Sequence, residues 1–192
     1  LQLAIVGSRN PTPGGRENAR DFARHLAGCG LTVTSGLARG VDGAAHRGAL
    51  AAGGATIAVC GTGLDRIYPP AHAELAGEIR ASGALVSEFW PGTPPRREHF
   101  PRRNRLISGL SLGVLVVEAG VRSGSLITAR LAGEQGREVF AIPGSIHNPL
   151  ARGCHQLLRQ GARLVESADD VLSELGALAV AGSVGRGTPA DD

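Results

Sequence analysis

Arginine and aromatic residues gather in the stretch from Phe89 to Ser111. Its central part, Arg96–Arg105, contains five arginines and a single acid, although the formal net charge of the whole chain is only +3. The stretch also holds three of the six aromatic residues of the chain, Phe89, Trp90 and Phe100. Arginine presents a planar fork of N–H groups that matches phosphate oxygens, and unpaired bases stack on aromatic rings. This combination indicates a surface for single-stranded nucleic acid.

Glycine, hydroxyl and arginine residues recur directly after the apolar runs of the sequence. Continuous apolar runs are typical of strands buried on both faces of a parallel sheet, and ligands bind beyond the carboxyl ends of such strands. A tight turn needs glycine for its own geometry, but five such turns on one edge favour an anion-binding rim. The turns are Gly7–Asn10, Ser35–Asp42, Gly61–Gly63, Gly120–Ser125 and Pro143–Ser145.

Groups for catalysis or cofactor binding do not assemble in the sequence. No G-x-G-x-x-G follows the first strand and no phosphate-loop motif occurs, so a nucleotide cofactor is not expected. The six histidines show no metal-ligand spacing. Glu118 stands at the end of a strand, where an acid could do chemistry, but pairing with an arginine or capping of a helix accounts for it equally. Asp42 stands at a helix start, where the helix dipole stabilises a carboxylate. The sequence predicts a binding platform rather than an enzyme.

Apolar runs alternate with helix-like segments, which predicts an α/β fold with a doubly wound, mostly parallel sheet and helices on both faces. We expect strands at 3–7, 31–36, 56–61, 84–88, 112–119, 138–143 and 163–165. We expect helices near 15–29, 41–52, 71–82, 103–110, 125–135, 155–160 and 168–178. Residues 1–178 are predicted to form one domain, and the Gly/Ser/Pro-rich residues 179–192 a linker toward a further C-terminal domain.

Composition sets the remaining bounds. The three cysteines are far apart without metal-ligand spacing, which favours reduced thiols in the cytoplasm. We find neither an export leader nor a run of about 20 apolar residues, so no membrane role is expected. All 20 basic residues are arginines, part of which reflects genomic base composition, so only their placement is informative. Because the first residue already adjoins a strand, we expect the chain to be a fragment of a longer protein.

Several long motifs resemble the DprA/Smf (DNA-processing protein A) family of bacteria. They are AIVGSR, TSGLARGVDGAAH, AVCGTGLDRIYPP, EFWPGTPPRREHFPRRNRLISGLS, VLVVEAGVRSGSLITA and VFAIPG, in the order of the family and within residues 3–172. The resemblance implies an extended Rossmann-like domain that binds single-stranded DNA and forms a homodimer. It also implies a recombination mediator that protects incoming DNA and loads the RecA recombinase in natural transformation, with no nucleotide cofactor and no established turnover.

The same resemblance implies a set of DNA-binding residues. The GSR turn supplies backbone-phosphate contacts, the SGLARG segment a wall of the pocket, and the FPRRNR and RSGSLIT segments the remaining contacts. The implied residues are Gly7, Ser8, Arg9, Ser35, Gly36, Arg39, Gly40, Phe100, Arg102, Arg103, Asn104, Arg105, Arg122, Ser123, Gly124, Ser125 and Thr128. The arginines at the start of the helix that carries Arg103 oppose its dipole, so we expect an anionic ligand to neutralise them. Arg96 and Arg97 lie outside the motif proper.

An enzyme is the alternative hypothesis. The chain is also similar to nucleoside-monophosphate phosphoribohydrolases of the related Rossmann group, which carry P-G-G-x-G-T-x-x-E after the fifth strand. The corresponding segment here reads EAGVRSGSLIT and lacks the paired glycines and the trailing acid. Apolar residues in Gly153–Leu178 belong either to the core or to an interface, and the sequence does not locate the surfaces for a second copy or for RecA.

Overall fold

The backbone of this computed structural model is described for residues 1–184 and its side chains for residues 1–176. Seven strands form one sheet: β1 Gln2–Val6, β2 Thr32–Ser35, β3 Thr56–Val59, β4 Ala84–Val86, β5 Gly113–Val116, β6 Glu138–Ala141 and β7 Arg163–Leu164. The α-helices are α1 Pro13–Gly28, α2 Val41–Ala51, α3 Ala73–Ser82, α4 His99–Gly109, α5 Gly124–Glu134, α6 Arg152–Arg159 and α7 Ala168–Val184. Each predicted strand and helix has its counterpart in this order.

The sheet is doubly wound. Its strand order is β4-β3-β2-β1-β5-β6-β7, and all six described pairings between neighbouring strands are parallel. The chain builds outward from β1 to β4, crosses back through α4, and continues from β5 on the other side of β1. The order therefore reverses between β1 and β5, and a crevice opens there at the carboxyl ends of the two strands.

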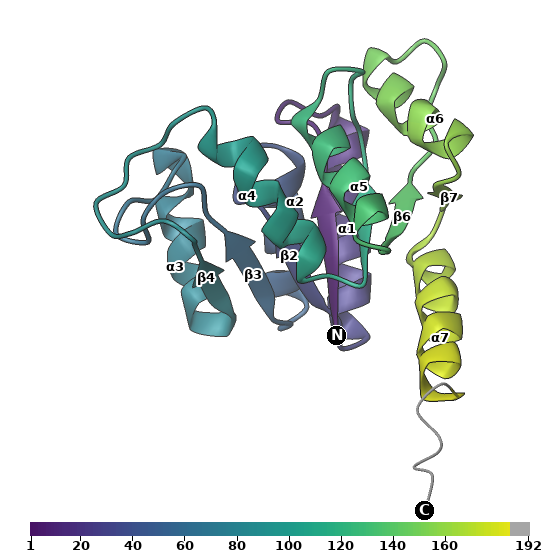
Figure 1. The fold of residues 1–192 in the computed structure, drawn as a ribbon, viewed down its shortest axis with the longest axis horizontal. Coiled ribbons are helices and arrows are strands. Elements are labelled where there is room, and N and C mark those ends of the chain that lie inside the picture. Colours follow the sequence, from purple (N-terminus) through teal and green to yellow (C-terminus); the bar gives the residue numbers. More distant parts are fainter. Residues whose placement is uncertain (185–192) are drawn as a thin grey trace, which may run out of the picture.

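Helices cover both faces of the sheet (Figure 1), as the continuous apolar runs predict. Alternate residues of β1 point to opposite faces. Leu3 and Ile5 join a core with α1 and α2, whereas Ala4 and Val6 join a core with α4, α5 and α6. All four side chains are almost completely buried. The α/β Rossmann-like fold class predicted from the sequence is thus confirmed.

Two helix boundaries differ from those expected. Helix α4 begins at His99, four residues before the predicted start, because Pro101 lies in its first turn, where a missing N–H costs no helical hydrogen bond. Helix α7 continues to Val184, so residues 179–184, predicted as linker, have helical backbone. The rest of the predicted linker, residues 185–192, lies outside the described residues. No helix within the described part of the chain has the length and apolar character needed to cross a membrane.

Candidate nucleic-acid interface

The turn after β1 brings Arg9 to the carboxyl edge of the sheet. The Ser8 N–H donates to the carbonyl oxygen of Glu118 at 2.6 Å, and the Ser8 carbonyl accepts from the N–H of Val41 at 3.1 Å. Gly7 is needed at this crossing, because a Cβ there would lie 2.8 Å from Val41 Cγ2. The turn is therefore held between the end of β5 and the start of α2, while the Arg9 side chain extends into solvent.

Phe100, in the first turn of α4, lies at the centre of the basic and aromatic side chains. Its ring packs on Gly61, where a Cβ would come within 2.9 Å of Phe100 Cδ1. The guanidinium of Arg9 lies 5.6 Å from the ring centroid and that of Arg103 lies 5.9 Å from it. The ring of Tyr68 lies 5.5 Å away, tilted by 41°. Two rings and two cations from three separate segments thus meet at this point.

Arg103 is a buried arginine, with 3% of its surface exposed. Its Nη1 donates to the Gly36 carbonyl at 2.8 Å and to the Val59 carbonyl, which lie at the ends of β2 and β3. Its Nε has no partner among the described atoms. Burial lowers the pKa of Arg103, and the nearby negative charge of Asp42 raises it in part. One N–H of this buried cation is thus unpaired among the described residues.

The Asp42 carboxylate binds the loop that contains Gly36, one of the two hydrogen-bond partners of Arg103. Its Oδ2 accepts the N–H groups of Gly36 at 3.1 Å and Ala38 at 3.3 Å. Burial raises the pKa of Asp42, while the charge of Arg103 and the two backbone hydrogen bonds lower it. The prediction of a structural role for Asp42 at the start of α2 agrees with these contacts, although the carboxylate binds the preceding loop.

The loop between β5 and α5 forms the opposite wall. Ser123 is the N-cap of α5, its Oγ accepting the N–H of Ser125 at 3.3 Å, and the two hydroxyl oxygens lie 2.7 Å apart. Asn104 Nδ2 reaches across from α4 to donate to the Gly124 carbonyl at 3.3 Å. Arg122 is exposed on the same loop. The wall presents a helix N-terminus, two hydroxyls and an arginine, groups that suit an anion.

These walls enclose an open cavity of about 630 Å³ at the point where the strand order reverses, here called the switch-point cavity. Its charged lining residues are four arginines and one acid: Arg9, Arg97, Arg103, Arg122 and Asp42. Eleven predicted site residues line it: Gly7, Ser8, Arg9, Phe100, Arg103, Asn104, Arg122, Ser123, Gly124, Ser125 and Thr128. The cavity therefore concentrates positive charge in a chain whose net charge is only +3.

Four predicted residues lie behind or beside the cavity. Ser35 is fully buried and its hydroxyl donates to the Ile5 carbonyl at 2.6 Å. Gly36 leaves room for the side chain of Arg103, because a Cβ on residue 36 would lie 2.8 Å from Arg103 Nη2. Gly40, at φ +79°, leaves room for the GSR turn, because a Cβ would lie 2.4 Å from the Ser8 carbonyl oxygen. Arg39 is exposed and is not among the lining residues.

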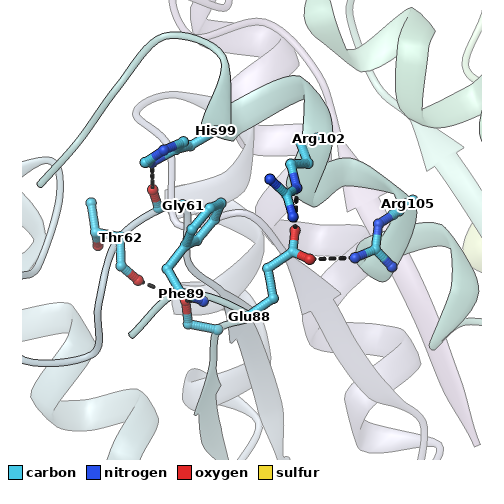
Figure 2. A network of polar contacts seen from close by, with 8 residues as sticks. Gly61, Thr62, Glu88, Phe89, His99, Arg102 and Arg105 are labelled. Atoms are coloured by element: carbon cyan, nitrogen blue, oxygen red, sulfur yellow. Dashed lines mark hydrogen bonds and ion pairs between the residues drawn. The ribbon is translucent and has the colours of Figure 1, made fainter. Parts of the chain in front are cut away.

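Arg102 and Arg105 face away from the cavity toward Glu88. Figure 2 shows the carboxylate of Glu88 between the two guanidinium groups. Arg102 Nε lies 3.7 Å from Glu88 Oε1, and Arg105 Nη2 donates to Glu88 Oε2. A carboxylate of the protein itself thus offsets one of these two positive charges, and the expectation that a bound anion neutralises the arginines of α4 stays a prediction for Arg102 and Arg105.

Among the lining residues that were not predicted as part of the site are one aromatic and one basic side chain. Tyr68 comes from the segment between β3 and α3, and no spacing rule connects this residue with Phe100. The motifs leave Arg97 outside the site, together with Arg96, yet the structure places Arg97 at the cavity. An excess of arginine was the signal for Arg97, whereas only the folded chain brings Tyr68 to the site.

Glu118 joins three loops instead of lining the cavity. Its Oε2 accepts the Thr12 N–H at 2.8 Å, and its Oε1 accepts the Thr12 hydroxyl at 2.7 Å and the Asn148 amide at 3.3 Å. Thr12 is the N-cap of α1, so Glu118 supports the start of another helix. The described residues contain no cluster of three or more His, Cys, Asp or Glu side chains that could hold a metal ion.

Comparison with known proteins assigns this arrangement to a family. A family model described as DNA recombination-mediator protein A matches residues 1–176. The chain belongs to this family. The resemblance of its motifs to DprA/Smf proteins is thereby confirmed.

Individual DprA/Smf proteins match over most of the chain. Protein Smf of Escherichia coli (strain K12) is 57% identical over 176 residues, which is 91% of this chain and 47% of that protein. DNA processing protein DprA of Streptococcus pneumoniae is 50% identical over 173 residues, 90% of this chain and 61% of that protein. The chain thus spans about half to three fifths of the length of these DprA/Smf relatives.

Solved DprA structures share the fold. The X-ray structure of DprA from Streptococcus pneumoniae superposes with a TM-score of 0.84 at 49% identity, covering 90% of this chain and 61% of that one. A DprA structure from Helicobacter pylori, described by its single-stranded DNA binding mode, has a TM-score of 0.84 at 34% identity, covering 91% and 80%. A molybdenum cofactor binding protein from Rippkaea orientalis, at 18% identity and a TM-score of 0.65, covering 92% and 96%, shares the fold alone.

Proposed function

We propose that this domain binds single-stranded DNA in the switch-point cavity. The observation that carries the proposal is the lining of that cavity, which combines four arginines with the rings of Phe100 and Tyr68. The single acid there, Asp42, accepts two backbone N–H groups and offsets the charge of Arg103 in part, so the cavity keeps an excess of positive charge. Guanidinium groups bind phosphates, and aromatic faces accept bases that are not paired.

An unpaired strand suits this cavity better than a duplex does. Phe100 is half-buried and Tyr68 is exposed beside it at the sheet edge, and a base can stack on such rings when it is free to turn away from its neighbours. The groups beside the rings are arginines, hydroxyls and the N-terminus of α5, which bind phosphates of any sequence. We therefore expect strong salt dependence and slight base preference.

The wider role proposed here is that of a recombination mediator. We propose that the full protein, as a homodimer in the cytoplasm, protects incoming single-stranded DNA and loads the RecA recombinase in natural transformation. Membership of the DNA recombination-mediator protein A family supports this role. The relative from Helicobacter pylori, described as binding single-stranded DNA, supports the ligand.

Fluorescence anisotropy of a labelled oligothymidylate at several salt concentrations tests the DNA-binding proposal. Each neutralised phosphate contributes a slope of about −0.7 to log affinity against log salt. Arg9→Ala removes an exposed arginine of the cavity and should reduce the steepness of the slope by about one such step. Arg159→Ala, which removes an exposed arginine at the end of α6, is the matched control and should leave binding unchanged. Equal affinities for wild type and Arg9→Ala would refute the site.

The hydrolase alternative predicts a different readout. A phosphoribohydrolase needs a carboxylate free to act on the sugar, whereas Glu118 holds Thr12 and Asn148, and Asp42 accepts backbone N–H groups. Incubation with AMP, followed by chromatography for adenine, should therefore show no release. Adenine that appears with wild type and disappears with Glu118→Gln would favour the enzyme over the DNA-binding domain.

A further inference from the structure

Trp90 is an aromatic side chain that does not line the switch-point cavity. It is the only tryptophan of the chain, and 85% of its surface is exposed. It lies in the segment 87–98, here called the Trp90 loop, which joins β4 to α4. A large apolar ring in water forgoes the stabilisation that burial would give. An exposed tryptophan therefore suggests contact with a ligand rather than a role in the core.

The backbone of the Trp90 loop is fixed against the turn that follows β3. The Gly92 N–H donates to Asp65 Oδ1 at 2.8 Å, and the Gly63 N–H donates to the Thr93 carbonyl at 3.1 Å. The Trp90 carbonyl accepts the Thr93 N–H at 3.1 Å. A Cβ on Gly63 would lie 2.5 Å from that carbonyl oxygen, so the two segments are in close contact.

The residues on the N-terminal side of Trp90 are fixed as well, as Figure 2 shows. Glu88 binds Arg102 and Arg105 of α4. The ring of Phe89 stacks on the ring of His99 with centroids 4.2 Å apart, and His99 Nδ1 lies 3.1 Å from the Gly61 carbonyl oxygen. Contacts on both sides thus hold the Trp90 backbone in place while its own side chain stays exposed.

The Trp90 loop continues from the cavity. Gly61 packs against Phe100 inside it, and Gly63, at most about 7 Å further along the chain, lies against the backbone carbonyl of Trp90. Arg97 belongs to the Trp90 loop and also lines the cavity. Arg96 precedes it and is exposed. A strand that leaves the cavity past Arg97 therefore enters the loop on which Arg96 and the ring of Trp90 are exposed.

We propose that Trp90 is an outer stacking platform for a base of the same DNA strand, just beyond the switch-point cavity. This inference rests on the proposed function. Continuity with the cavity favours nucleic acid over a protein partner, since Arg97 lines the cavity and the exposed charges of the loop are Arg96, Arg97 and one acid, Glu98. The guanidinium groups of Arg96 and Arg97 would bind the phosphates on either side of the stacked base. Because the loop is already held in place, binding does not require the loss of conformational entropy that ordering a flexible loop would cost.

Tryptophan fluorescence tests this directly, because Trp90 is the only tryptophan. Titration of the protein with an oligothymidylate of about twelve nucleotides, within the range of known single-strand site sizes, should change the emission in step with binding measured by anisotropy. An oligothymidylate of about four nucleotides should fill the cavity first and change the emission much less. Unchanged emission at saturation with the longer strand would overturn the proposal.

Matched variants separate this platform from the cavity. Trp90→Ala should weaken binding of the longer strand about tenfold, the size expected for one lost stacking contact, and leave the shorter strand within about twofold. Trp90→Phe should restore most of the affinity, because it retains an aromatic face. Leu164→Ala, which truncates an exposed apolar side chain on β7 at the far edge of the sheet, is the control and should change neither.

The outcomes distinguish this inference from the proposed function. If wild type binds neither strand, both proposals fail. If wild type and Trp90→Ala bind the longer strand equally, only the platform fails and the cavity stands. A change in oligomeric state with Trp90→Ala at unchanged DNA affinity would assign the ring to a protein contact instead and would overturn the platform.

Discussion

The guanidinium of Arg9 lies 5.6 Å from the centroid of the Phe100 ring, although ninety positions separate the two residues in the chain. Arg9 comes from the turn after β1 and Phe100 from the first turn of α4, which belongs to the crossover between β4 and β5. Reversal of the strand order brings the two together at the sheet edge. A cation and a ring are thus placed side by side before any ligand arrives.

Phe100→Leu should separate the contribution of stacking from that of charge. Leucine keeps an apolar contact with Gly61 but offers no aromatic face, so we expect the free energy of oligothymidylate binding to weaken by about 1–3 kcal/mol. The slope of log affinity against log salt should stay that of wild type, because no charge is removed. Anisotropy titrations at three salt concentrations give both quantities. A shallower slope would show that Phe100 acts by positioning Arg9 or Arg103.

Arg105→Ala should affect DNA binding less than Arg9→Ala does. Glu88 pairs with Arg105, whereas Arg9 lies at the cavity and has no acidic partner among the described residues. We expect less than about a threefold change in the dissociation constant for Arg105→Ala. Loss of the partner leaves Glu88, whose side chain is only 16% exposed, with the weaker contact to Arg102. The free energy of unfolding in urea should fall by about 1 kcal/mol. Equal losses of affinity in both variants would contradict the assignment of Arg105 to the ion pair with Glu88.

Gly36→Ala should perturb the site through Arg103. A Cβ at this position would lie 2.7 Å from Asp42 Oδ2 and 2.8 Å from Arg103 Nη2, and both side chains are buried. We expect a loss of about 1–3 kcal/mol in the free energy of unfolding together with weaker DNA binding. Gly77→Ala in α3 is the control: a Cβ there meets nothing within 4 Å, and the change should stabilise the helix by about 0.5–1 kcal/mol. A Gly36→Ala variant as stable as wild type would contradict the described packing.

Acid should destabilise the fold through His46. Its Nδ1 lies 2.7 Å from Thr56 Oγ1, and burial, followed by the charges of His72, Arg103 and Arg47, lowers its pKa from 6.5 to about 3. As the pH falls below 6.5 the unfolded chain takes up a proton that the folded protein excludes until about pH 3. Stability is therefore lost over this range, by roughly 2 kcal/mol between pH 7 and pH 5.

Urea unfolding at pH 7 and pH 5, with wild type and His46→Gln, measures this contribution. Glutamine can donate to Thr56 but does not titrate, so the variant should show a smaller difference between the two pH values. Identical differences in both proteins would show that His46 accepts its proton without cost and that other groups cause the acid sensitivity.

The sequence predicted the fold well because its signals are local. Buried runs such as Leu3–Val6 and the helical spacing of apolar residues determine each element on their own, and the order of the elements determines the winding. The start of α4 was placed four residues late because Pro101 is compatible both with a loop and with the first turn of a helix.

The site could be predicted only in part because the direction of side chains depends on the packed structure. The motifs named the residues around the cavity, but they did not separate Arg103, buried beside Asp42, from Arg102 and Arg105, which bind Glu88. These three arginines lie within four positions on one helix and point to different partners. Tyr68 reaches Phe100 through the path of a long loop, which no short spacing encodes.

Glu118 has a consequence for attempts to redesign the protein. Its carboxylate joins the loops that contain Thr12 and Asn148, and its backbone carbonyl holds the N–H of Ser8. Three loops that follow different strands are therefore not independent modules. Exchanging one of these loops for that of another protein would displace the other two, unless the new sequence preserves the contacts with Glu118. The loops at this edge of the sheet therefore have to be exchanged together.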